Sequence, residues 1–158
     1  QPYDLATETK GALTLLFFGY TRCPDVCPIT LSILDSALRD LSRPAADATV
    51  VFVGVDNARD TPDRMRGYLD DRGKGFIGLN PQVPLDVLNR ALTTLLLPGV
   101  TIAPAELDGA YVVGHPSQVL VYSPDNKAHI MYQFGVTKAD WEKDLPRLAE
   151  FDWPTTTR

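Results

Sequence analysis

Residues that commonly bind metals or form disulfides are scarce in this sequence, which has two cysteines, two methionines and two histidines among 158 residues. Two cysteines are too few for a disulfide scaffold. A chain of this length buries roughly 68–70% of the surface that its unfolded form exposes, so it needs neither a disulfide nor a metal merely to fold. We therefore expect a single domain over residues 1–158, with residues 153–158 as a loose tail.

Long apolar runs and clusters of basic residues are absent as well. The longest apolar stretch lies around Leu13–Gly19, far below the ~20 residues that a membrane-spanning helix requires. The net charge of −5 and the pI near 4.9 argue against nucleic acid or an anionic membrane surface as the main partner. Since the chain begins at Gln1 and not at Met, we expect that a signal peptide or an anchor was removed from a longer form.

The first two thirds of the sequence alternates between strand and helix patterns. Leu13–Gly19 and Thr49–Asp56 are predicted to be strands buried on both faces, because they are largely apolar. The apolar spacing and the positions of Thr and Pro predict further elements: helices over Ile29–Leu41, after Thr61 and from Pro84 to Leu95, and a short strand at Phe76–Leu79.

The last third has a different pattern. Residues 98–109 contain prolines, glycines and an Asp-Gly pair, which predict an irregular insertion that ends in a tight turn. Strands follow at Tyr111–Val113, Gln118–Tyr122 and Ala128–Phe134, and the last two are predicted to form a hairpin. Thr137 is predicted to cap a final helix that Pro146 disturbs.

This order of elements is typical of an α/β protein with a thioredoxin-like fold: a mixed central sheet with helices on both faces and a C-terminal hairpin plus helix. In such a sheet the loop after the first parallel strand lies outside the carboxyl ends of the strands, where open α/β sheets place their ligands. That loop carries both cysteines, in the segment Phe17–Pro28, FFGYTRCPDVCP. The functional site is therefore expected there.

Cys23 and Cys27 lie four positions apart, on one side of a helical turn, and three interpretations fit that spacing. A disulfide that closes so short a loop stabilises by only about 2 kcal/mol, so a purely structural role is the weakest. A redox couple is supported because a helix N-terminus stabilises thiolates, although thioredoxin-type enzymes have one residue fewer between their cysteines. A metal site would need further ligands: zinc takes four, whereas Cu(I) accepts fewer and softer donors.

Three further side chains offer sulfur or nitrogen donors, and a structural role is the better interpretation of each. His129 alternates with apolar neighbours in a predicted strand, so it is expected at the surface or against the sheet. Met65 lies on a predicted helix face and Met131 in a predicted strand, where methionines usually fill the core. None of the three is predicted to be a ligand.

His115 is the better candidate for a third ligand. It lies between Gly114 and Pro116, in a loop flanked by predicted strands. A lone loop histidine is more often an exposed bystander, but in thioredoxin-like folds this loop approaches the cysteine loop. A site made of Cys23, Cys27 and His115 is therefore geometrically available.

Four segments together resemble the Sco (SenC/PrrC) family of copper-binding proteins. They are FFGYTRCPDVCP followed by ITL, VDNARDTPDRMRGYL, FIGL and YVVGHPSQVLVY, and they occur in this order between Leu13 and Phe134. The cysteine segment is the most specific of them. The histidine segment departs from the family pattern, in which Ser commonly follows the ligand histidine directly, because Pro116 follows His115 here.

The resemblance implies one copper ion, as Cu(I) or Cu(II), bound by Cys23, Cys27 and His115. It also implies a metallochaperone that helps to assemble the dinuclear copper centre of cytochrome c oxidase subunit II, by delivering copper, by reducing thiols or by both. Another copper chaperone and a thioredoxin-like reductant are further expected partners, and we expect a monomer. The expected location is extracytoplasmic: the periplasm or the outer face of the cytoplasmic membrane, with an anchor in the full-length form, or the mitochondrial intermembrane space.

Two other functions stay open at this point. The first is a thiol–disulfide oxidoreductase or peroxiredoxin-like enzyme with Cys23 and Cys27 as its redox-active pair. The second is a redox or copper sensor that acts through a protein interface. We do not expect enzymatic activity as the main function, although a secondary thiol–disulfide reductase activity is compatible with the cysteine pair.

Overall fold

The structure is a computed structural model that describes residues 3–73, 75–105 and 110–152. Five strands form a central sheet: β1 (Thr14–Gly19), β2 (Thr49–Gly54), β3 (Ile77–Leu79), β6 (Val119–Tyr122) and β7 (Ala128–Tyr132). Their order across the sheet is β3-β2-β1-β6-β7. β2 is parallel to both β1 and β3, while β6 is antiparallel to β1 and to β7. The predicted mixed sheet and C-terminal hairpin are therefore confirmed.

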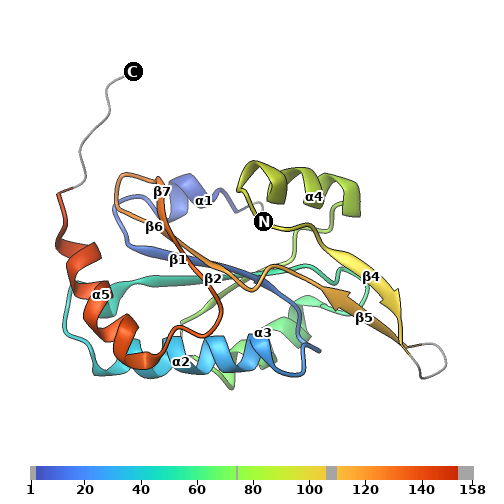
Figure 1. Ribbon diagram of the computed structural model, residues 1–158, viewed down its shortest axis with the longest axis horizontal. Coiled ribbons are helices and arrows are strands. Elements are labelled where there is room, and N and C mark those ends of the chain that lie inside the picture. The colour runs from blue at the N-terminus through green and yellow to red at the C-terminus, as the bar shows by residue number, and fades with distance from the viewer. Residues whose placement is uncertain (1–2, 74, 106–109, 153–158) are drawn as a thin grey trace.

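Helices cover both faces of this sheet (Figure 1). One face carries α2 (Val26–Asp40), α3 (Pro62–Asp70) and α5 (Lys138–Glu150), and the other carries α1 (Leu5–Glu8) and α4 (Leu85–Thr94). α2 and α3 lie on the same face because each connects parallel neighbouring strands by a crossover of the same hand. The arrangement is the thioredoxin-like fold that the order of elements predicts.

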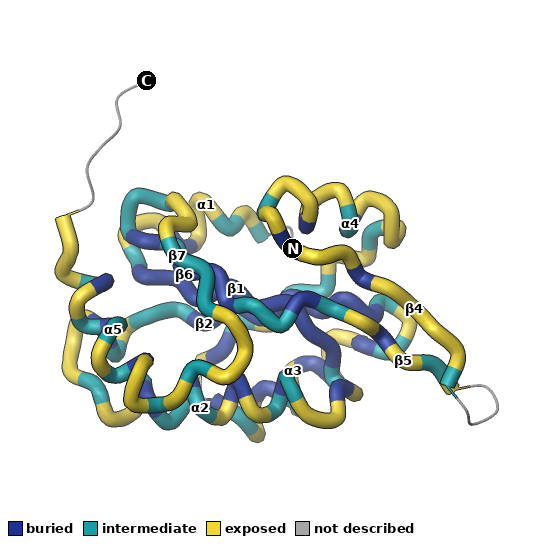
Figure 2. Tube along the Cα trace, in the orientation of Figure 1, coloured by how far each residue is buried: buried dark blue, intermediate teal, exposed yellow. Residues whose placement is uncertain are grey.

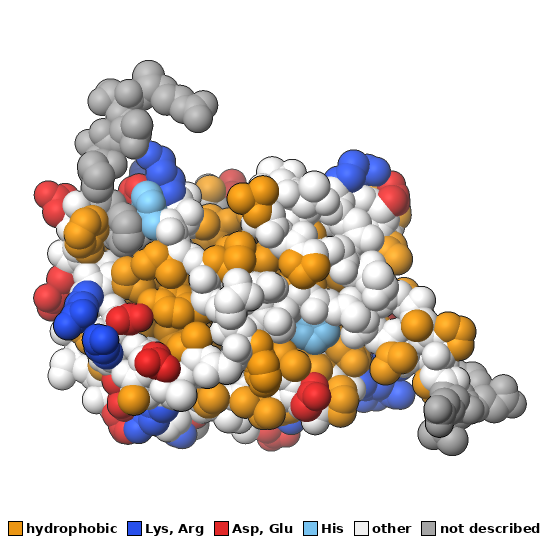
Figure 3. Space-filling view, in the orientation of Figure 1, with side chains coloured by type: hydrophobic (Ala, Val, Ile, Leu, Met, Phe, Trp, Pro, Cys, Tyr) orange, Lys and Arg blue, Asp and Glu red, His pale blue; other side chains and the backbone are white. Residues whose placement is uncertain are grey.

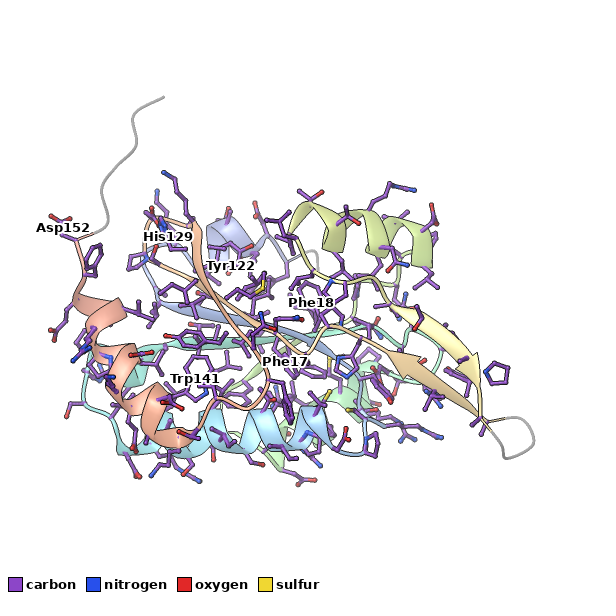
Figure 4. All side chains as sticks on the ribbon, viewed as in Figure 1. Phe17, Phe18, Tyr122, His129, Trp141 and Asp152 are labelled. Atoms are coloured by element: carbon purple, nitrogen blue, oxygen red, sulfur yellow. The ribbon has the colours of Figure 1, made fainter. Side chains whose placement is uncertain are left out.

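The core is built on β1 and β2, which run through the middle of the molecule and are buried along almost their whole length (Figure 2). Successive side chains on a strand point to opposite faces, and Phe17 and Phe18 accordingly point to the two sides of β1 (Figure 4). Phe17 packs against Phe52 of β2 with ring centroids 6.0 Å apart. Because helices cover both faces, these strands are apolar without alternation.

The last helix differs in one respect from the expectation. Thr137 caps α5 in a capping box with Asp140, as the sequence predicts, but the helix continues through Pro146 to Glu150. Leu145 next to the proline is fully buried. Packing of the apolar face against the core maintains the helix where local propensity disfavours it.

The prediction of an irregular insertion at residues 98–109 is wrong for the first part of that segment. β4 (Thr101–Pro104) pairs with β5 (Tyr111–Gly114) in a separate two-stranded sheet, which projects from the body of the molecule and which we call the β4–β5 arm (Figure 1). All four residues of β4 are exposed, and its last residue, Pro104, argues in the sequence against a strand. The predicted turn at Asp108-Gly109 and the tail at residues 153–158 lie outside the described residues.

Among the described residues, none of the helices combines the length and the apolarity that crossing a bilayer requires. On the face shown in Figure 3, Lys and Arg side chains are dispersed around the rim, while hydrophobic side chains gather over the hairpin β6–β7 and α5. A groove of about 180 Å³ in this apolar region is lined by Ile29 and Ile33 of α2 and by Trp141 of α5.

Candidate metal centre

The loop after β1 and the first turn of α2 hold the two cysteines. Asp25 caps α2, because its carboxylate accepts a hydrogen bond of 2.6 Å from the Val26 amide. Cys27 is the second residue of the helix and is fully buried, and Cys23 precedes the cap and is 7% exposed. The Cys27 amide points at the Cys23 sulfur over 3.4 Å. The helix N-terminus therefore directs a backbone donor at Cys23, which favours its thiolate form.

His115 reaches the cysteines from the base of the β4–β5 arm. It follows Gly114, the last residue of β5, and its Nε2 lies 3.5 Å from the sulfur of Cys23 and 3.6 Å from the sulfur of Cys27. The three potential ligand atoms lie within 4.8 Å of one another. The structure thus brings together all three residues that the sequence predicts for the site.

The other ring nitrogen of His115 is held by the backbone. Nδ1 lies 3.0 Å from the carbonyl oxygen of Phe18 and 2.8 Å from that of Pro116. Both partners can only accept, so Nδ1 carries a hydrogen, and Nε2 is the ring nitrogen that is left to bind a metal. A backbone partner of this kind fixes the tautomer and the ring orientation of metal-binding histidines. Pro116 therefore contributes to the orientation of His115 through its carbonyl group.

Two aromatic rings complete the surroundings of the imidazole. Tyr20 packs against the ring of His115 edge to face, at 5.4 Å between centroids and 81° between planes. Phe17 does so from β1 at 6.3 Å and 72°. These contacts restrict the ring of His115 and keep the sulfur–imidazole group largely out of water. The sequence shows the two aromatic residues but gives no sign that they contact the histidine.

The protonation states of the two thiols are opposite. The pKa of Cys23 falls to about 4, chiefly because the Cys27 thiol hydrogen-bonds to its sulfur; burial opposes this effect, and a hydrogen bond with His115 adds to it. The pKa of Cys27 is raised by burial and by the neighbouring Cys23. Burial lowers the pKa of His115, but hydrogen bonds with Cys23 and with the Pro116 carbonyl outweigh it, and the net shift is upward. Without a metal, the proton therefore stays on Cys27 and the thiolate on Cys23.

The remaining candidate donors lie elsewhere, as the sequence predicts. His129 is at the far end of the β6–β7 hairpin, near α1 (Figure 4), where it pairs with Asp125 at 3.0 Å. Met65 is buried in the core, and Met131 packs against the core from β7. Among the described residues, Cys23, Cys27 and His115 are the one group of three or more His, Cys, Asp or Glu side chains that could hold a metal ion.

The chemistry of this donor set is soft. Two sulfurs and one imidazole nitrogen suit Cu(I), which accepts few and polarisable ligands, whereas structural zinc sites have four. Loading would remove the proton from Cys27, because metals bind the thiolate. The same two sulfurs can also take part in thiol–disulfide exchange, in which the Cys23 thiolate is the nucleophile.

Fold and site define a thioredoxin-like protein in which a cysteine pair at a helix N-terminus meets a histidine from a distant loop. The chain belongs to the SCO1/SenC family, whose model matches residues 5–150.

Relatives of known name and structure agree with this assignment. A Stutzerimonas stutzeri protein named for copper binding is 38% identical over 136 residues, covering 82% of this chain and 63% of its own length. Protein SenC of Rhodobacter capsulatus is 33% identical over 136 residues, covering 78% of this chain and 58% of its own. The chain thus spans less than two thirds of either relative. The structure of Bradyrhizobium japonicum ScoI with copper bound superposes with a TM-score of 0.76 at 30% identity, over 90% of this chain and 88% of that one.

Proposed function

We propose that this protein binds one copper ion through Cys23, Cys27 and His115. The observation that carries the proposal is the position of His115 Nε2, 3.5 Å and 3.6 Å from the two sulfurs, with Nδ1 held by two carbonyl groups. Copper bound to the similar ScoI structure supports the choice of metal. Cu(I) would be held by the two thiolates and the imidazole, and Cu(II) by the same ligands with an added oxygen donor.

The biological role that follows is copper handling for cytochrome c oxidase. Membership of the SCO1/SenC family supports this role, and the resemblance to Sco proteins implies that the recipient is the dinuclear copper centre of subunit II. We place the protein outside the cytoplasm, where another copper chaperone would supply the metal and a thioredoxin-like protein would reduce the cysteines. Copper is the cargo in this role, so the site must release it as well as bind it.

An anaerobic titration of the reduced protein with Cu(I), in competition with a chromophoric Cu(I) chelator, tests the site. We expect one tightly bound copper in the wild type, and a loss of affinity of more than about tenfold in Cys23→Ala, Cys27→Ala and His115→Ala. His129→Ala removes the second histidine, which lies at the other end of the molecule, and is the matched control. A wild type that binds no copper, or three site variants that bind it as tightly as the wild type, would refute the proposal.

The role in oxidase assembly has its own test. The copper-loaded protein is mixed with the soluble domain of subunit II, either reduced and copper-free or oxidised and copper-free. Delivery predicts that copper moves to the reduced domain and not to the oxidised domain, as metal analysis of the separated proteins would show. If the reduced domain takes up no copper, the delivery role fails.

Thiol–disulfide exchange is a second candidate, favoured by the low pKa of Cys23. The Cys23 thiolate would attack a disulfide of subunit II and release one of its sulfurs as a thiolate. Cys27 would then lose its proton and attack Cys23, so that a Cys23–Cys27 disulfide forms and the second sulfur leaves. The partner gains two electrons, one proton from Cys27 and one proton from solvent, and a dithiol reductant restores the pair. Reduction of the oxidised subunit by copper-free wild type but not by Cys23→Ala would establish this activity.

A further inference from the structure

The strand that leads to His115 does not belong to the central sheet. β5 pairs with β4 in the separate two-stranded sheet of the projecting arm. His115 follows this strand directly, so its position relative to the cysteines depends on how the arm is fastened to the body. The backbone hydrogen bonds of the central sheet begin at Val119 of β6, after His115, and do not include the strand that precedes it.

Tyr111, the first residue of β5, is fastened by two residues that follow β2. Its hydroxyl donates a hydrogen bond of 2.7 Å to Asp56, and the guanidinium of Arg59 stacks over its ring at 3.6 Å. Nη1 of Arg59 also donates to the Tyr111 carbonyl oxygen over 3.2 Å, and Nε of Arg59 forms an ion pair with Asp56. The Asp56 side chain is 2% exposed and that of Arg59 is 18% exposed. We call Asp56, Arg59 and Tyr111 the tyrosine clamp.

Arg59 reaches the imidazole from a second direction as well. Its guanidinium lies 5.9 Å from the ring centroid of Tyr20, and Tyr20 packs edge to face on the ring of His115. One partly buried side chain therefore contacts both the strand that carries His115 and the ring that packs against its imidazole. An ion pair on the protein surface would contact neither the strand that carries His115 nor the ring of Tyr20.

We propose that Asp56 and Arg59 are positioning residues that hold His115 on the two sulfurs by clamping Tyr111. The inference rests on the proposed copper site. It states that the imidazole contributes fully to the copper affinity only while the clamp holds it in place. Ligands bind a metal tightly when their supporting contacts hold them in place beforehand, to within about 0.5 Å. Loosening the clamp leaves the cysteines in place and lets His115 move away with the arm.

The test compares conservative variants by Cu(I) competition. Arg59→Lys keeps the charge but loses the planar stacking group, and we expect about tenfold weaker copper binding. Tyr111→Phe keeps the ring and loses only the hydroxyl, so we expect a smaller loss in the same direction. Arg72→Lys is the matched control, because Arg72 stacks on Tyr68 at 3.7 Å and donates to its carbonyl oxygen over 2.8 Å without contacting the arm. Its affinity should equal that of the wild type.

A double-variant cycle separates positioning from general destabilisation. In a His115→Ala background the Arg59→Lys change should no longer alter copper affinity, because there is no imidazole to position. An equal loss with and without His115 would overturn the proposal, and so would an unchanged affinity in both clamp variants. Thermal unfolding checks that the variants are folded, and Tyr111→Phe, the milder change, decides the matter if Arg59→Lys does not fold.

The copper-free protein provides an independent measurement. NMR of the imidazole nitrogens should show a hydrogen fixed on Nδ1 of His115 in the wild type and in Arg72→Lys, and an average of the two tautomers in Arg59→Lys. A fixed tautomer in Arg59→Lys would refute the clamp. If the wild type binds no copper, the proposed function fails, and this measurement still decides whether the clamp positions His115.

Discussion

The sulfur of Cys27 occupies the space beside Gly19, the last residue of β1, where a β-carbon would come within 2.5 Å of it. The same β-carbon would lie 2.8 Å from the ring of Phe52. Both neighbours are fully buried, so neither can move into solvent. The absence of a side chain at Gly19 is therefore a condition for the position of Cys27.

Gly19→Ala is predicted to destabilise the protein and to displace the Cys27 sulfur. Forcing a methyl group into a packed core costs about 1–3 kcal/mol, and chemical denaturation would measure the loss. The copper affinity should fall as well, because one of the two sulfurs moves. Gly67→Ala is the control: a β-carbon at this position in α3 would meet no neighbouring group within 4 Å, and alanine in a helix interior stabilises by about 0.5–1 kcal/mol relative to glycine. Equal effects of the two changes would contradict this account.

Cys23 is predicted to react with alkylating reagents at a pH far below the usual range of thiols. Its pKa of about 4 makes it a thiolate at pH 6, whereas Cys27 stays protonated and buried. Mass spectrometry after brief treatment of the copper-free protein with iodoacetamide should find the label on Cys23 alone. Cys27→Ala should raise the pKa of Cys23, since the hydrogen bond from Cys27 is the largest cause of the shift. A wild-type reaction that rises only above pH 8 would contradict the prediction.

The low pKa of Cys23 also links stability to pH. A group whose pKa is lower in the folded state stabilises the fold fully above its unfolded pKa, which is about 8.5 for a thiol. That contribution is lost as the pH falls toward 4. Cys23→Ser, which lacks the thiolate, should therefore lose less stability than the wild type between pH 9 and pH 4, as followed by urea unfolding of the copper-free, reduced proteins.

Met65→Leu is predicted to leave copper binding unchanged. Met65 is 3% exposed and fills the space above Gly54 and Gly78, where β-carbons would meet its side chain at 2.5 Å and 2.7 Å. Leucine of similar volume should cost less than about 1.5 kcal/mol of stability. Copper competition with Met65→Leu beside the wild type checks the prediction, and a weaker complex would show that the thioether is a ligand after all.

The strands that are buried on both faces could be predicted from the sequence. β1 and β2 are apolar without interruption because helices cover both sides, so their position in the sheet and the cysteine loop that follows could be predicted. β4 could not, because its exposed residues pair only with β5 and bury no face of their own. α1 was missed for the same reason: it is four residues long and none of them is buried.

The three candidate ligands could be predicted from the sequence, but the groups that hold His115 in place could not. His115 was identified because the fold brings its loop to the cysteines. The groups that orient its ring are the carbonyls of Phe18 and Pro116. Every residue has a backbone carbonyl, so the sequence does not indicate which of them contact the histidine. The contact of Arg59 with Tyr111 joins residues 52 positions apart, so the clamp requires the folded chain.

Asp60 ties the cysteine loop to the start of α3. Its Oδ1 accepts hydrogen bonds from the amide and the hydroxyl of Thr21, at 3.0 Å and 2.6 Å, while its Oδ2 is buried without a hydrogen-bond partner among the described residues. Burial raises the pKa of this carboxyl, and the hydrogen bonds from Thr21 oppose the shift without cancelling it. The folded protein therefore binds a proton at Asp60 more tightly than the unfolded chain does.

Asp60→Asn is predicted to gain stability relative to the wild type as the pH rises. A carboxyl with a raised pKa stabilises the fold fully below its unfolded pKa of about 3.9, and the contribution is lost as the pH passes the folded value. Asparagine does not titrate and keeps an oxygen that can accept from Thr21. Urea unfolding of both proteins at pH 4 and pH 7.5 should show that the stability of the variant, relative to that of the wild type, is higher at pH 7.5 than at pH 4. A difference that is constant with pH would mean that Asp60 is ionised equally in the folded and unfolded chain.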